Sequence, residues 1–366
     1  MRVLAASVLV LLASLPVLAD DWLPLSEART GRTPEPDVWS WVEQRTLQIG
    51  RPDASDGIQV LVLPIEFPDV KGTMTKEELE EAFFTGDRSL AAYYRKVSRE
   101  GVEVKGEVAP WVRAIVPKKY VVELPSVGFA EIDYRLLLDR LPDATRERLT
   151  DFDVLVFVIA GSQAPEWAGL LWPHAGPFAD GTHVFEKIVL AEKGGKNDAF
   201  QREVLFHEFG HTLGIPDKYC YLQAFGIPHE CEVQRVGRHC LMGWGSSPCA
   251  WCRIQMGWLE PTILATGEAQ SLRLPPVEKG GGVAKIFLGS RSRYLLVSNE
   301  EGELRVLRLG EPWRRFKNHL LWIDLDCVVA EKLEAAKTFE LAGGVRLVDA
   351  QPGDDGEIRL RVEFAE

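Results

Sequence analysis

Beyond its first 19 residues the sequence lacks any apolar run long enough to cross a bilayer, and no cysteine precedes Cys220. The first absence excludes a helical membrane span in the body of the chain. The sequence also lacks an excess of positive charge, since 42 Lys and Arg residues are outnumbered by 54 Asp and Glu residues, for a formal net charge of -12. This acidic balance argues against nucleic acid and anionic membrane surfaces as partners.

The first 19 residues form an apolar segment of a different kind. Arg2 precedes an apolar run that extends to Leu18. The end of this segment, Val17-Leu18-Ala19 before Asp20, fits a small-residue cleavage site. This pattern is typical of a secretory signal peptide and is too short for a membrane span. A buried N-terminal helix is the alternative. We therefore expect a secreted protein, either extracellular or periplasmic.

The length of 366 residues predicts two domains, because a domain commonly has about 150 residues. After the signal peptide at 1–19, residues 20–55 are expected to form an N-terminal extension or a short prosegment. A main domain should cover 56–261 and a small all-β domain 262–366.

Strand and helix patterns alternate in the main domain, which predicts an α+β fold with a mixed sheet. The expected strands are Ile58–Phe67, Val102–Val108, Tyr120–Leu124, Asp153–Ile159 and Thr182–Leu190. The expected helices are Ser89–Ser98, Glu131–Leu149 with a break or kink at Pro142, and Ala199–Leu213 with Asp198 as its N-cap.

From about residue 262 the sequence turns to short β-rich runs separated by turn residues such as Gly280-Gly281-Gly282 and Pro352-Gly353-Asp354. This spacing predicts an antiparallel sandwich or barrel. The expected strands are Ser271–Leu274, Ala284–Leu288, Tyr294–Ser298, Leu304–Leu309, Leu320–Asp326, Val345–Val348 and Glu357–Phe364. The region contains no catalytic triad, phosphate loop or repeat, so we expect it to have a structural or substrate-positioning role.

The strongest chemical signal is the stretch FHEFGHTLGIPD, which runs from Phe206 to Asp217. His207 and His211 are four residues apart, so on a helix both project from one face and can reach one Zn²⁺. Glu208 follows the first histidine, where it can take a proton from water at the metal. The pattern therefore predicts a catalytic zinc site.

The residues after this helix strengthen the prediction. Gly214 can adopt the left-handed conformation that ends a helix, and Pro216 prevents the helix from restarting. The reversed chain can bring Asp217 to the metal as a third ligand and leave a position for water. The alternatives are a chance HExxH pattern and a solvated turn carboxylate at Asp217. Against the first alternative, two histidines in an apolar helix would be costly without a partner.

The pattern HExxHxxGxxD, followed by a methionine in a tight turn, resembles the metzincin zinc endopeptidases. More narrowly it resembles the secreted metallopeptidases of the immune-inhibitor-A type, whose third ligand is also an aspartate. Weaker matches to that family are Leu61–Asp69, Ser89–Ser98, Val104–Val108, Trp172–His174, Leu241–Gly243 and Met256–Leu259. The resemblance implies a zincin-like domain, a mixed twisted sheet with an active-site helix. In such a domain Thr182–Leu190 would be the antiparallel edge strand to which an extended peptide adds.

The resemblance also suggests roles outside the zinc motif. Met242 would form an apolar floor beneath the zinc, whereas without the HExxH match it would be interpreted as an ordinary core residue. His174 is a candidate for lining the cleft. The resemblance further suggests calcium binding, which carboxylates such as Glu66 and Asp69 would permit.

Six cysteines crowd the later part of the chain, namely Cys220, Cys231, Cys240, Cys249, Cys252 and Cys327. In an exported protein we expect them to form disulfides, among 15 connectivities that the sequence does not separate. A second, structural zinc site with His229 or His239 is the alternative. The CxxC spacing of Cys249 and Cys252 follows no thioredoxin-like strand, which argues against redox catalysis. Because residues 20–55 hold no cysteine, a prosegment thiol that caps the zinc is excluded.

The function predicted from these features is that of a secreted zinc endopeptidase acting on a protein or peptide substrate. His207, His211 and Asp217 would hold the zinc, and Glu208 would move a proton from water to the leaving amine. Two alternatives stay open: a secreted, non-catalytic binding protein on a zincin scaffold, and a zinc hydrolase of a non-peptide amide or ester.

Overall fold

The structure is a computed structural model, and it describes residues 57–365 with several gaps. The gaps are 116, 119–121, 124–130, 133–136, 163–172, 181–182, 195–198, 216, 219–235, 266, 291–292, 301, 310–324 and 331–337. The expected signal peptide at 1–19 and the extension at 20–55 lie outside the described residues. The chain divides into two compact units, one ending at Gly214 and the other continuing from Ile215 to Glu366. The protein is thus a mixed α+β protein, and its two units are described in turn.

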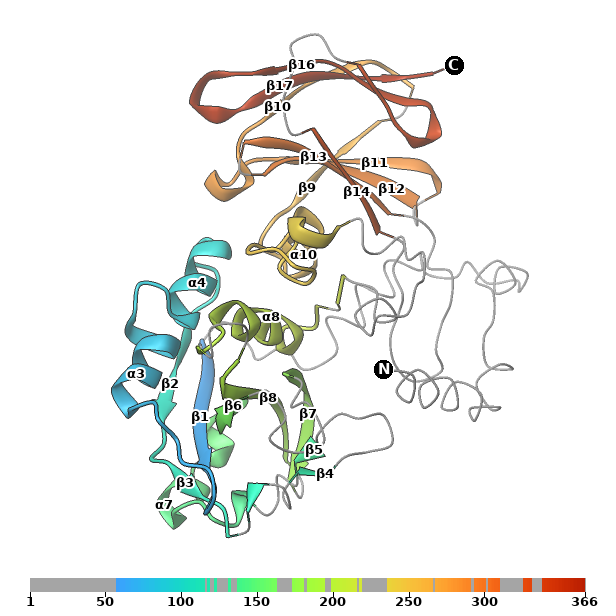
Figure 1. Cartoon of the computed structure of the whole chain (residues 1–366). Coiled ribbons are helices and arrows are strands. Elements are labelled where there is room, and N and C mark those ends of the chain that lie inside the picture. Colours follow the sequence, from blue (N-terminus) through green and yellow to red (C-terminus); the bar gives the residue numbers. More distant parts are fainter. Residues whose placement is uncertain are drawn as a thin grey trace, which may run out of the picture. The chain divides into compact units, whose positions relative to one another are not determined.

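A mixed sheet forms the frame of the first unit (Figure 1). Its strands are β1 (Ile58–Glu66), β2 (Val104–Val108), β6 (Val154–Ser162), β7 (His174–Asp180) and β8 (His183–Lys193), in the order β2-β1-β6-β8-β7, while β3 (Val112–Arg113) also pairs with β1. Every pairing is parallel except that of β7 with β8. The antiparallel strand therefore lies at the edge of the sheet.

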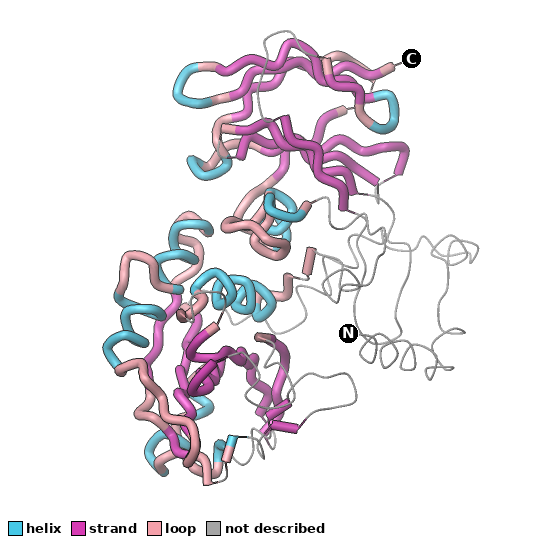
Figure 2. The backbone as a smooth tube through the Cα atoms, viewed as in Figure 1, coloured by secondary structure: helices cyan, strands magenta, loops and turns pink. Residues whose placement is uncertain are grey.

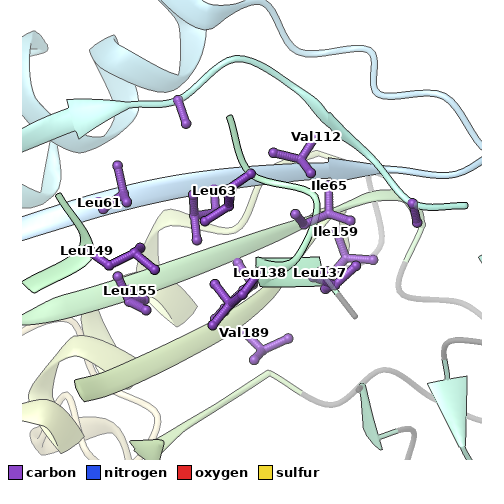
Figure 3. Packing of buried hydrophobic residues seen from close by; sticks show 14 of the residues in the cluster. Leu61, Leu63, Ile65, Val112, Leu137, Leu138, Leu149, Leu155, Ile159 and Val189 are labelled. Atoms are coloured by element: carbon purple, nitrogen blue, oxygen red, sulfur yellow. The ribbon is translucent and has the colours of Figure 1, made fainter. Parts of the chain in front are cut away.

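One face of this sheet is covered by residues from 137 to 152 (Figure 3). Alternate residues of β1, among them Leu61, Leu63 and Ile65, pack against Leu137 and Leu149. These side chains are 4% exposed or less. The remaining β1 residues between them are also buried, as expected for a central strand whose two faces are both covered.

Three helices of this unit have clear starting signals or partners. Helix α3 (Lys76–Glu80) begins with a capping box of Thr75 and Glu78, and α4 (Leu90–Val97) begins at Ser89, whose hydroxyl accepts from the Ala92 amide at 3.1 Å. Helix α8 (Arg202–Thr212) contacts α4, β7 and β8. The remaining described elements are short: π-helix η4 (Glu81–Thr85), β4 (Val122–Glu123), β5 (Glu131–Ile132), α7 (Asp143–Arg146) and 3-10 helix η5 (Leu149–Asp151).

Two expectations for this unit are wrong. Residues 131–149 do not form a helix that is only broken or kinked at Pro142. Strand β5 occupies 131–132, and α7 spans just four residues after Pro142, which is its N-cap. The strand expected at 182–190 exists as β8, but it is not the edge strand, because β7 pairs with it on the outer side.

Two packed sheets form most of the second unit (Figure 2). The larger contains β9 (Pro261–Leu264), β11 (Val283–Ser290), β12 (Arg293–Glu300), β13 (Glu303–Leu309) and β14 (Leu325–Ala330), and the smaller contains β10 (Gln270–Leu274), β15 (Phe339–Glu340), β16 (Val345–Pro352) and β17 (Ile358–Phe364). Side chains from both sheets share one apolar cluster, which includes Ile286, Val297, Leu347 and Leu360. The antiparallel strands predicted beyond residue 262 thus build a sandwich, with β9 and β11 as its parallel pair.

A short helix, α10 (Ala250–Gln255), precedes the sandwich and contacts β12. The buried carboxylate of Glu300 accepts from the Ala250 amide at 3.1 Å and faces the Arg305 guanidinium at 3.0 Å. This buried ion pair ties the start of α10 to β12 and β13. The remaining described elements are the 3-10 helices η7 (Gly237–His239), η8 (Val277–Lys279), η9 (Ala342–Gly344) and η10 (Asp354–Gly356). Among the helices of the described ranges, none is long and apolar enough to cross a membrane.

Candidate metal centres

Helix α8 carries the HExxH motif. It begins at Arg202, later than the expected Ala199, because Ala199 is held in a β-bridge with Gly194. Gln201 is therefore the N-cap, and Asp198 lies outside the described residues. The main chain of the motif is tied to α4, since the buried Tyr94 hydroxyl donates to the Phe206 carbonyl at 2.6 Å.

His207 and His211 lie next to each other on this helix. Their ring centroids are 4.9 Å apart and the ring planes are nearly perpendicular. Both residues are partly exposed, whereas Leu205 and Phe209 are fully buried. The two imidazoles are thus on the accessible side of a helix whose other sides are packed in the unit.

Helix α8 ends just before Gly214, as the sequence predicts. Leu213 is the C-cap, and Gly214 has a φ of +83°, a left-handed conformation that a residue with a side chain rarely adopts. The Gly214 amide donates to the His211 carbonyl at 2.8 Å. A ligand atom of each of His207, His211 and Asp217 then lies within 4.8 Å of the others. This spacing is compatible with a single ion bound by two imidazoles and one carboxylate.

Glu208 differs from its neighbour His207 in exposure. Only 5% of it is exposed, while both histidines are partly exposed. Glu208 thus lies beside the metal-compatible group while its own side chain is largely removed from solvent.

The turn that contains Met242 is compact. Its glycines pack against backbone, because a Cβ on Gly243 would lie 2.3 Å from the Gly237 carbonyl oxygen and one on Gly245 would lie 2.3 Å from that of Arg238. Met242 is 1% exposed. Its carbonyl accepts from the amide of Lys218 at 2.6 Å. The turn is thus bonded to the residue that follows Asp217.

A second group of metal-binding side chains consists of Cys240, Cys249 and Cys252, which are buried, free thiols. Burial opposes ionisation of Cys240, but hydrogen bonds from Cys249 and Cys252 outweigh it and hold the pKa of Cys240 well below its usual value. Cys220 and Cys231 lie outside the described residues, as do His229 and the side chain of Cys327. The expected disulfides stay a prediction.

The burial of Lys218 was not predicted from the sequence, because a lysine that follows an aspartate is usually an exposed turn residue. Lys218 is 1% exposed, and its Nζ lies 3.7 Å from the centroid of the Trp251 ring. Burial lowers the pKa of Lys218, and the neighbouring Cys252, Cys249, Cys240 and Asp217 act in the opposite direction. The burial of this lysine was not predictable, because it depends on α10 and on the cysteines around it.

The remaining candidate residues, His174, Glu66 and Asp69, lie outside both metal-compatible groups of the described residues. His174 is the first residue of the edge strand β7 and pairs with Val189 of β8. Glu66 forms an ion pair with Lys71 at 2.6 Å, and Asp69 accepts from the Lys118 amide at 2.9 Å. Neither carboxylate belongs to the two metal-compatible groups found among the described residues. Calcium binding stays a prediction.

Comparison with known proteins adds no assignment. No model of a known protein family matches the chain, and no curated protein matches it.

Proposed function

We propose that this protein is a secreted zinc-dependent endopeptidase with the active site on α8. The observation that carries the proposal is the cluster of His207, His211 and Asp217, whose ligand atoms all lie within 4.8 Å of one another. Two imidazoles and one carboxylate are a donor set typical of catalytic zinc, because three protein ligands leave a position for water. The expected signal peptide supplies the export.

The chemistry divides between the metal and Glu208. Bound zinc supplies a lowered pKa for water and polarisation of the scissile carbonyl. Glu208 takes the proton of the attacking water and delivers it to the leaving amine. Its low exposure supports this role, because a carboxylate shielded from bulk water transfers protons within the site.

The edge strand β7 supports a peptide as the substrate. It is the antiparallel end of the sheet, and α8 contacts it. An extended peptide can add to such an edge through main-chain hydrogen bonds, which would align it beside the helix that carries both histidines. His174, at the start of β7, is then a candidate for contact with the substrate.

The test is zinc content and casein cleavage of the purified mature chain, compared with the variant Glu208→Gln. The variant should retain zinc and fold, while its cleavage rate falls by a factor of about 10²–10⁴, the usual contribution of a general base. Glu203→Gln is the matched control, because Glu203 lies on the same helix with 65% of its side chain exposed. It should cleave at the wild-type rate.

The outcomes separate the alternative functions. Wild-type cleavage by Glu208→Gln would contradict the mechanism. Zinc binding with ester or amide hydrolysis that depends on Glu208, but no casein cleavage, would indicate a non-peptide hydrolase. Zinc binding without hydrolysis of either kind would favour a binding protein.

A further inference from the structure

Three thiols in the second unit have the spacing of metal ligands. Cys240, Cys249 and Cys252 are at most 1% exposed, and their Sγ atoms all lie within 4.8 Å of one another. The Cys240–Cys252 and Cys249–Cys252 sulfur distances are 3.5 Å and 3.6 Å. Thiolates placed tetrahedrally about zinc, at Zn–S distances of about 2.3 Å, are separated by about 3.8 Å. The two observed sulfur distances are therefore close to the sulfur–sulfur distance expected in a tetrahedral zinc site.

Buried Lys218 is a second, independent observation. Its Nζ faces the Trp251 ring and has no hydrogen-bond partner within the part of the chain that the structure describes. A protonated amine in such a buried position is stabilised by negative charge nearby. Three thiolates around a divalent ion carry a net charge of about -1, which would balance the lysine.

The backbone around the thiols is already ordered for such a site. The Cys240 carbonyl accepts from the amides of Gly243 and Gly245, each at 2.9 Å, which places this thiol at the start of the turn that contains Met242. Cys249 is the N-cap of α10, and Cys252 is in the first turn of that helix. An ion on these sulfurs would join the turn to the helix.

We propose that Cys240, Cys249 and Cys252 bind a second, structural metal ion of the class that prefers thiolates, with zinc as its occupant. Each cysteine that ligates loses its thiol proton, so up to three protons are released per ion. A fourth donor, from the protein or from water, would complete the tetrahedral shell. The site is independent of the proposed catalysis, since it shares no residue with His207, His211 or Asp217.

The experiment uses the full mature chain with His207→Ala and His211→Ala, so that zinc at α8 is removed from the count. Elemental analysis should find about one zinc per chain in this background and about two in the wild type. Adding Cys249→Ser or Cys252→Ser to the histidine variant should reduce the zinc to well below one per chain. Ser290→Ala, on β11 in the same unit, is the control and should retain the ion.

A spectroscopic measurement covers the case in which the cysteine variants fail to fold. Cobalt(II) exchanged into the folded histidine variant should give intense visible bands of a tetrahedral site and near-ultraviolet bands from thiolate to cobalt. Cobalt spectra without thiolate bands would overturn the proposal. So would a mass about 2 Da below that of the reduced chain with a disulfide mapped among these three cysteines, or zinc retained at one per chain in both serine variants.

Discussion

The amide of Lys218 donates to the carbonyl of Met242 at 2.6 Å, which links the residue after a candidate zinc ligand to a turn 24 positions later in the sequence. Asp217 is directly bonded to Lys218 along the chain, so the position of its backbone depends on that turn. The conformation of that turn depends on Gly243, which packs against the Gly237 carbonyl. We therefore expect the position of Asp217, the candidate third ligand, to depend on Gly243, which has no ligand atom of its own.

Gly243→Ala tests this dependence. The added Cβ would lie 2.3 Å from the Gly237 oxygen, so the backbone must shift, at a cost of about 1–3 kcal/mol. We expect a lower melting temperature and weaker zinc binding at the His2Asp site, measured by competition with a chelator. Gly282→Ala is the control, because no atom lies within 4 Å of its added Cβ. Equal zinc affinity in the two variants would contradict the link.

Trp244 follows the same turn and is 60% exposed. Large aromatic side chains are common anchors in protein interfaces, so Trp244 is a candidate contact for a protein substrate. Trp244→Ala should raise KM for a protein substrate roughly 5- to 10-fold, equivalent to about 1–1.4 kcal/mol, with kcat and zinc content unchanged. Ile263→Ala removes an equally exposed apolar side chain, 62% exposed, from β9. A similar KM for both variants and the wild type would remove Trp244 from the binding surface.

The parts of the fold that the sequence predicted are those set by local signals. Ser89 caps α4 through its own hydroxyl, and the mostly apolar stretch 58–66 forms the central strand β1. The same holds for the site, because the spacing of His207 and His211 and the conformation of Gly214 are properties of one helix and its end.

The parts that the sequence did not predict depend on distant partners. Strand β7 contains Gly176 and Pro177, which disfavour a strand, and it forms because β8 supplies the partner while Pro177 is tolerated at an edge. The apolar residues 137–149 have a helix-like pattern, yet they cover the sheet as short turns on either side of Pro142. Likewise, the grouping of three cysteines around Lys218 requires contacts that no spacing rule provides.

Glu192 shows how one buried carboxylate fixes a loop to the sheet. It is fully buried and accepts from the amides of Thr73 and Met74, from the Thr73 hydroxyl at 2.9 Å and from the Gly161 amide at 3.0 Å. Glu192→Ala would leave these donors unpaired, so we expect the free energy of unfolding to fall by about 3 kcal/mol or more in urea titrations.

The matched comparison for Glu192 is Glu107→Ala. Glu107 pairs with Arg148 at 3.0 Å, but about half of each side chain is exposed. An exposed ion pair of this kind contributes less than about 1 kcal/mol. A loss for Glu192→Ala as small as that for Glu107→Ala would show that the loop is held by other contacts.

Glu186 on β8 should make the stability of the first unit depend on pH. Burial raises its pKa from 4.5 to about 7, although the adjacent Lys187 acts in the opposite direction. Since the folded protein holds this proton more tightly than the unfolded chain, the stabilisation is complete below about pH 4.5 and is lost as the pH rises through about 7. Because the side chain is only partly buried, solvent screening limits the effect to about 1 kcal/mol.

Urea unfolding at several pH values between 4.5 and 7.5, for the wild type and Glu186→Gln, would measure this contribution. The wild type should lose more stability than the variant as the pH rises through this window, because the glutamine has no proton to release. All other titrating groups are common to both proteins, so they cancel in the comparison. Parallel stability curves would mean that Glu186 titrates at the same pH in the folded and unfolded chains, and that its place on β8 leaves its carboxylate fully hydrated.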